Sequence, residues 1–171
     1  PPHNALVLSV DEKPSIQALE RARGYVYTSS GKIVQGMKST YKRHGTVNLF
    51  AALEVATGVI RGKTTQTKKR ADFQAFMDDV VAEQPADRQI HVILDNLNTH
   101  KKNDDWLAAH PNVTFHFTPT SASWLNQVEI WFGIFQRKTL NNASFKSIEQ
   151  LSQAIHAFTA AYNENAAPFV W

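Results

Sequence analysis

Short apolar runs recur along the chain and predict strands of a sheet. Residues 5–10, ALVLSV, are apolar on both alternating faces, as in a central strand that is covered on both sides. Residues 89–95, QIHVILD, have the same character. Residues 113–117, VTFHF, form a further strand-like run. These three segments are expected to pair within one sheet.

The first third of the chain also predicts hairpins. Residues 25–35, YVYTSSGKIVQ, have a strand-like run on each side of Ser-Ser-Gly. Residues 46–65 give a stronger pattern of the same kind, with the turn at Thr57-Gly58. Antiparallel strands are therefore expected early in the chain.

Apolar residues at helical spacing predict the helices. Residues 71–84 form one amphipathic segment, and Pro85 ends it. A short helix is expected at about 102–110. A helix starting near Ser123 is apolar on most of its circumference, so it should pack into the body of the protein. A final amphipathic helix is predicted for residues 147–163.

The order of these elements predicts an α/β fold. Antiparallel strands come first, and strand–helix–strand crossovers follow, which fits a ribonuclease H-like mixed five-stranded sheet flanked by helices better than a doubly wound sheet. No repeat, low-complexity tract or long linker interrupts the chain, so residues 1–171 are expected to form a single domain.

Composition excludes several classes of protein. The chain has no Cys, which rules out disulfides and thiolate zinc sites. No apolar run approaches the length of about 20 residues that a membrane helix needs. The first residues, PPHNALVLSV, carry neither an initiator Met nor a signal peptide, which suggests a fragment. A net charge of +3 and a pI of about 9.2 permit a nucleic-acid partner without requiring one.

Two of the apolar runs end in a carboxylate, namely Asp11 and Asp95. In open sheets, ligands bind beyond the carboxyl ends of parallel strands, where both residues are expected. Glu129 follows Asp95 by 34 residues and shares a helix face with Leu125 and Phe132. A charge on such a face lies toward the interior or a cleft and needs a partner, which a divalent metal would supply.

Carboxylates from separate elements suit Mg²⁺, which prefers hard oxygen ligands. Two such ions about 3.5–4 Å apart can promote an in-line displacement at phosphorus. A structural interpretation is equally open, because a lone Asp after a strand commonly caps a turn or helix, and a lone Glu on an aromatic-rich helix commonly reaches solvent. The residues alone leave both interpretations standing.

Four stretches carry a resemblance to a known family. They are VDEKPSIQALER at 10–21, YKRHGTVNLFAALEVATG at 41–58, ILDNLNTHK at 93–101 and FTPTSASWLNQVEIWF at 117–132. In these stretches the chain resembles bacterial insertion-sequence transposases of the Tc/mariner superfamily, in particular the insertion-sequence-630 family. The resemblance covers essentially the whole chain.

The resemblance implies a catalytic and metal-binding triad of Asp11, Asp95 and Glu129, with the family's own 34-residue spacing. Asp11 is preferred to Glu12, because strand alternation sends Glu12 to the other face. The implied cofactor is Mg²⁺ or Mn²⁺, with two ions. The implied domain is a DDE catalytic domain with a ribonuclease H-like core, and the family's amino-terminal helix-turn-helix DNA-binding region is absent from this chain.

The same resemblance implies cleavage at transposon ends and transfer of the freed 3′-hydroxyl into target DNA at TA sites, whose steps are easily kinked. It also implies double-stranded DNA as partner, a homodimer that pairs two transposon ends, no membrane association, and a bacterial cytoplasmic location. Two alternatives remain: a ribonuclease H-type or junction-resolving nuclease, and a non-catalytic DNA-binding remnant of a transposon.

Two groups of residues are candidates for supporting roles. Near the acids, Asn96, His100 and Asn126 are expected either to orient a carboxylate or to be an ordinary turn, surface or capping residue. Basic residues are expected either to contact DNA phosphates or to form a solvated face; the candidates are Lys68, Lys69, Arg70, Lys101, Lys102 and Arg137.

Motifs for other chemistries are absent. The glycines and lysines of residues 31–39 and 58–65 have the wrong spacing for a phosphate-binding loop and lie in predicted hairpins. No H-E-x-x-H and no G-x-S-x-G sequence occurs, so zinc peptidases and serine hydrolases are excluded.

Overall fold

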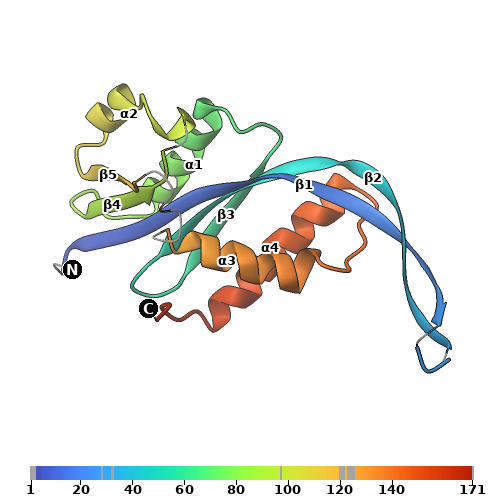
Figure 1. Ribbon diagram of the computed structural model, residues 1–171. Helices are drawn as coiled ribbons and strands as arrows, with labels where there is room; N and C mark the ends of the chain where they lie inside the picture. Colours follow the sequence, from blue (N-terminus) through green and yellow to red (C-terminus); the bar gives the residue numbers. More distant parts are fainter. Residues whose placement is uncertain are drawn as a thin grey trace.

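A mixed sheet forms the centre of the protein (Figure 1). The computed structural model describes residues 3–27, 29–31, 33–96, 98–119, 122 and 126–170. Within these residues the sheet has five strands in the order β3-β2-β1-β4-β5. β1 pairs antiparallel with β2 and parallel with β4. The strands are β1 (Ala5–Tyr27), β2 (Ile33–Glu54), β3 (Ile60–Thr65), β4 (Gln89–Leu94) and β5 (Val113–Phe117).

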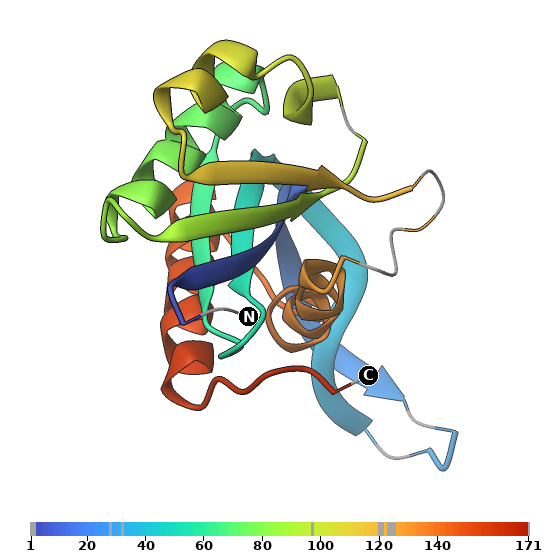
Figure 2. The ribbon, with the colours of Figure 1, turned by 90° about the vertical axis from the view of Figure 1, so that its left-hand side faces the viewer.

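Helices cover both faces of this sheet (Figures 1 and 2). α1 and α2 pack on one face, and α3 and α4 pack on the other. The predicted α/β fold with a mixed five-stranded sheet flanked by helices is therefore confirmed. The helices are α1 (Arg70–Ala82), the 3₁₀ turn η1 (Asn98–His100), α2 (Asp104–Ala109), α3 (Val128–Phe135) with its π-helical continuation η3 (Gln136–Leu140), and α4 (Ile148–Glu164).

β1 contributes to the cores on both faces. Leu8 and Val10 pack in the cluster on the α1 side, whereas Ile16 and Ala18 pack in the cluster on the α3 and α4 side. Strict alternation would keep these even-numbered residues on one face. The change occurs at an irregularity in the β1–β2 pairing between Lys13 and Ile16. An extra residue there shifts the phase of the alternation.

The length of β1 differs from expectation. The sequence predicts a strand at 5–10 and a separate hairpin at 25–35. The hairpin is confirmed by the pairing of Tyr25 with Gln35, but it is the outer end of one long antiparallel pair of β1 and β2 that extends beyond the body of the protein (Figure 1). The pairing shifts register at three places along its length. These shifts, and Pro14 inside the strand, remove the alternation by which a strand is recognised in sequence.

The second predicted hairpin, at 46–65, is confirmed as β2 and β3. Gly58 has a φ of +76°, and its N–H donates to the Glu54 carbonyl oxygen at 2.8 Å. A Cβ at this position would lie 2.1 Å from the backbone oxygen of Ala167. The turn therefore needs glycine both for its backbone angle and for the close approach of the chain's last residues.

The remaining helices agree with the predicted segments, with one exception. The helix expected from near Ser123 begins at Val128 in the described part of the chain, and residues 123–125 lie outside it. Among the described residues, no helix combines the length and apolar character needed to cross a membrane.

Candidate active site

Asp11 and Asp95 lie at the same edge of the sheet because β1 and β4 run parallel. Their pairing ends at Ser9 and Ile93, and β4 itself ends at Leu94. Asp95 therefore follows the carboxyl end of β4, next to the continuing β1. This is the placement that the apolar runs predicted.

Asp11 interacts with both other acids of the predicted triad. Its side chain is buried, with 6% exposure. Burial, a hydrogen bond to the Glu129 carboxylate and the negative charge of Asp95 raise the pKa of Asp11 to about 9. The N–H of Glu12 donates to Asp11 Oδ1 at 2.8 Å and opposes the rise. Three carboxyl groups from β1, the end of β4 and α3 thus share one electrostatic environment.

Buried hydrogen bonds hold the start of α3, and hence Glu129, against β1. The Val128 N–H donates to Ser9 Oγ at 2.9 Å. Ser9 Oγ also donates to Asn126 Oδ1, and Asn126 Nδ2 donates to the Val10 carbonyl oxygen at 3.3 Å. Ser9 and Asn126 are 0% and 1% exposed. In these contacts Asn126 ties α3 to β1, and its predicted role beside the acids stays a prediction. Sequence reasoning missed Ser9, whose pattern is that of an ordinary strand residue.

His100 connects Asp95 to a fourth carboxylate. Its Nδ1 lies 2.8 Å from Asp95 Oδ1, and its Nε2 lies 2.9 Å from Glu12 Oε2. The imidazole is fully buried, with its ring centroid 4.8 Å from that of Phe73 in α1. Burial lowers the pKa of His100, but the hydrogen bonds to Asp95 and Glu12 outweigh burial and raise it to about 9.

Glu12, for which the sequence predicts a place on the other face of the strand, belongs to the same cluster as Asp11. It is 8% exposed, and single ligand atoms of Asp11, Glu12 and His100 lie within 4.8 Å of one another. One signal in the sequence could have found it. A second carboxylate directly after Asp11 in a strand that is buried on both faces must also have a partner.

The donor set fits a divalent cation. Carboxylate oxygens are the ligands that Mg²⁺ and Mn²⁺ prefer, and imidazole is accepted by several divalent metals. The pKa of Asp11 is raised by burial first, and then by the hydrogen bond to Glu129 and the negative charge of Asp95. A bound cation would stabilise the ionised carboxylates and reverse this shift.

Asn96 and Arg70, two further predicted supporting residues, each donate a hydrogen bond to a backbone carbonyl oxygen. Asn96 Nδ2 donates to the Thr118 carbonyl oxygen at 3.0 Å, so this side chain ties the end of β4 to the end of β5 and does not bond to an acid in the described contacts. Arg70 Nε donates to the Lys101 carbonyl oxygen at 3.0 Å, which brings the start of α1 against the end of η1.

The basic candidates consequently form one cluster and one separate position. Lys68, Lys69 and Lys102 are exposed, and the contact between Arg70 and Lys101 brings the start of α1 next to the segment that carries His100. Arg137 is exposed on η3, next to the end of α3. Their contact with DNA stays a prediction.

A mixed five-stranded sheet flanked by helices, with acids at the carboxyl ends of its strands, is the ribonuclease H-like fold of transposases and integrases. Residues 7–152, well over half of the chain, match the DDE superfamily endonuclease family, and the chain belongs to this family. Membership implies nuclease or transposase activity, and enzymes of the superfamily use divalent metal ions.

Two solved structures share the fold. The Mos1 strand transfer complex aligns with a TM-score of 0.64 at 15% identity and covers 93% of this chain and 48% of that one. The Mos1 transposase paired-end complex with left transposon end aligns with a TM-score of 0.66 at 16% identity, with the same coverage. This chain thus spans about half the length of those proteins. No curated protein sequence matches it.

Proposed function

We propose that this chain is the catalytic core of a metal-dependent DNA transposase, with Asp11, Asp95 and Glu129 as its catalytic and metal-binding residues. One observation carries the proposal: burial, a hydrogen bond to Glu129 and the negative charge of Asp95 together raise the pKa of the Asp11 carboxyl group, although the three residues come from separate elements. The family match supports an activity on phosphodiester bonds.

In this mechanism each residue of the site has a defined task. Asp11, Asp95 and Glu129 would hold divalent ions, which supply a lowered pKa for the attacking water or 3′-hydroxyl and charge stabilisation at the phosphorus. His100 fixes the orientation of Asp95 through its bond to Oδ1. Ser9 and Asn126 hold α3 in place, so that Glu129 stays within reach of Asp11.

Double-stranded DNA is the proposed substrate, as transposon end and as target. One similar structure is a Mos1 strand transfer complex, and the other is a Mos1 transposase paired-end complex with left transposon end. Their shared fold supports this substrate class. Lys68, Lys69 and Lys101 would contact phosphates beside the acids. Insertion at TA sites, a homodimer, and a bacterial origin in the insertion-sequence-630 family of the Tc/mariner superfamily complete the proposal.

A strand-transfer assay tests this function. The chain is incubated with a pre-cut DNA end, a TA-containing target, and Mg²⁺ or Mn²⁺. Joined product is expected from the wild type and from Asp87→Asn, an exposed control acid, but not from Asp95→Asn. Joining by Asp95→Asn would remove that residue from the site.

The other outcomes separate the alternatives. Metal-dependent nicking without joining would favour a ribonuclease H-type or junction-resolving nuclease. DNA binding without any metal-dependent reaction, including with the DNA-recognition region restored, would contradict a catalytic role and favour a non-catalytic remnant.

A further inference from the structure

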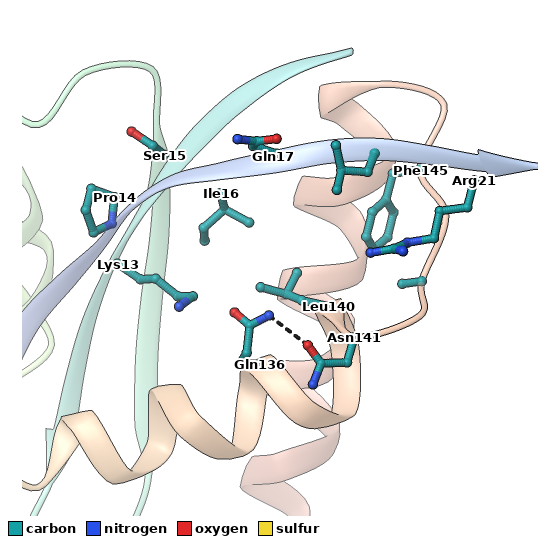
Figure 3. A pocket seen from close by; sticks show the side chains of 12 residues that line it. Lys13, Pro14, Ser15, Ile16, Gln17, Arg21, Gln136, Leu140, Asn141 and Phe145 are labelled. Atoms are coloured by element: carbon teal, nitrogen blue, oxygen red, sulfur yellow. Dashed lines mark hydrogen bonds between the residues drawn. The ribbon is translucent and has the colours of Figure 1, made fainter. Parts of the chain in front are cut away.

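A polar cavity of about 250 Å³ lies between β1 and the end of α3 (Figure 3). β1 forms one wall from Lys13 to Arg21, and η3 with the segment up to Phe145 forms the other. Lys13 is two positions beyond Asp11 in the same strand. One end of the cavity is therefore next to the acidic cluster, and the other end runs away from it along β1.

The charges that line this cavity have one sign. Lys13 and Arg21 carry the only ionised side chains among its described lining residues, and no carboxylate is among them. Gln136 and Asn141, joined by a hydrogen bond from Gln136 Nε2 to Asn141 Oδ1 at 2.9 Å, add amide N–H groups that can donate further hydrogen bonds. Figure 3 shows Lys13 and Gln136 directed into the space between β1 and α3. Such a lining suits an anion.

Arg21 is held at the far end of the cavity by its backbone. Its N–H donates to Ser144 Oγ at 2.9 Å, and the Phe145 N–H donates to the Leu19 carbonyl oxygen at 2.8 Å. The segment after η3 is thereby fixed against β1. Within the described residues, the buried Nε of Arg21 has no hydrogen-bond partner. Such a donor needs a partner from outside the described residues, which water or a ligand oxygen would supply.

We propose that this cavity binds the phosphodiester backbone of the DNA strand that continues from the reacting phosphate, with Lys13 and Arg21 on different phosphates. The proposal rests on the proposed function and adds a substrate-binding site to it. Eight residues of strand extend at most about 26 Å, and one strand of B-DNA carries a phosphate about every 3.4 Å along the helix axis. Lys13 and Arg21 are thus far enough apart along β1 to lie on different phosphates of one strand.

The two cations would play different parts. Lys13, adjacent to Asp11, would contact a phosphate close to the reacting one and help to set its distance from the acids. Arg21, whose planar guanidinium can donate two parallel hydrogen bonds, would fix the direction in which the strand leaves the site.

The salt dependence of DNA binding tests the proposal. A fluorescent duplex with a single-stranded 3′ extension is titrated with the 171-residue chain at several salt concentrations, without divalent metal, so that no bond is cut. Each phosphate contact contributes about 0.7 to 0.9 to the slope of log K against log salt. Arg21→Gln and Lys13→Gln are each expected to lower the slope by about this amount and to weaken binding several-fold at low salt.

Arg88→Gln is the matched control. Arg88 precedes β4 at the opposite end of the sheet and, like Arg21, is half-buried. Its variant should keep the wild-type slope, and Arg21→Lys should regain most of the slope that Arg21→Gln loses. Unchanged slopes in both folded cavity variants would overturn the proposal. An equal loss of slope in Arg88→Gln and in the cavity variants would also overturn the proposal, because the slope would then depend only on the net charge of the protein.

Two further arms identify the source of the anion and separate this proposal from the function it rests on. Inorganic phosphate that abolishes the slope difference between wild type and Arg21→Gln at about millimolar concentration would assign the cavity to a free anion and overturn the proposal. Loss of slope in the cavity variants of a chain that joins no DNA ends would uphold the binding site while contradicting the transposase function. Normal slopes in the cavity variants, together with normal strand transfer, would uphold the transposase function and contradict the binding site.

Discussion

His100 Nδ1 lies 2.8 Å from Asp95 Oδ1, and this contact joins a buried side chain to a partly exposed one. The His100 side chain is 0% exposed, whereas the Asp95 side chain is 35% exposed. The imidazole therefore holds the carboxylate from the protein side and leaves its other face toward solvent. Residues that orient metal ligands in this way commonly contribute tenfold to a hundredfold to metal affinity.

Replacing His100 with Ala should weaken divalent-metal binding by roughly 10- to 100-fold, because Asp95 loses the group that orients it. Titration calorimetry with Mn²⁺ measures this affinity directly. His156→Ala on the exposed side of α4 is the control and should leave it unchanged. An unaltered Mn²⁺ affinity in folded His100→Ala would show that the contact has no part in metal binding.

Stability without metal should fall as pH rises. The pKa of Asp11 is raised from 3.8 to about 9, so between these values the folded state binds a proton that the unfolded state has lost. The free energy of unfolding therefore decreases with pH in this window, by up to about 1.4 kcal/mol per pH unit. His100, raised from 6.5 to about 9, acts in the same direction above its ordinary pKa.

Urea unfolding between about pH 5 and 6 isolates the Asp11 contribution, since His100 is protonated there in both states. Asp11→Asn should remove the decrease with pH, and the surface variant Asp87→Asn should retain it. Saturating Mg²⁺ should also remove the decrease of the unfolding free energy with pH in the wild type. An identical pH slope in wild type and Asp11→Asn would contradict the perturbed pKa.

The Ser9–Asn126 contact should be energetically coupled. Each side chain is buried and gives the other a hydrogen-bond partner, so Ser9→Ala or Asn126→Ala alone should cost about 1–3 kcal/mol of stability. The double variant should cost less than the sum of the two. Chemical denaturation of all four proteins measures the coupling, and strict additivity would contradict a direct contact.

Gly58→Ala should destabilise the fold by more than its backbone angle alone requires. A positive φ costs a non-glycine residue about 1–2 kcal/mol, and the new Cβ would in addition meet the backbone of Ala167. Gly31, with a φ of +77° and nothing within 4 Å of the Cβ that a substitution would add, is the matched control. Thermal unfolding should show a clearly greater loss for Gly58→Ala, and equal losses would exclude the close approach.

The positions of Asp11 and Asp95 were predictable because both follow apolar runs that parallel pairing brings to one edge of a sheet. The partnership of Glu12 with His100 was not, since these residues are 88 positions apart and lie in segments with no shared periodicity. His100 becomes a buried residue because η1 packs against α1 and its imidazole reaches Glu12 of β1. Whether the three predicted acids carry out catalysis is a question for the variants above.

The full length of β1 could not be predicted from the sequence, for a different reason. A strand is recognised in sequence by its alternation, and the register shifts near Ile16, Leu19 and Arg23 interrupt it. Tertiary pairing with β2 compensates for the missing local signal.

The phase change in β1 also restricts how the length of this protein can vary during evolution. Ser15 has a φ of 53°, and its N–H donates to Asn48 Oδ1 at 3.0 Å, so the irregularity is built into the strand. Deleting one residue between Asp11 and Ile16 would send Ile16 and Ala18 to the opposite face and empty part of one core. Homologous chains should therefore tolerate insertions and deletions near the tip of the β1–β2 hairpin, while the segment from Asp11 to Ile16 keeps a constant number of residues.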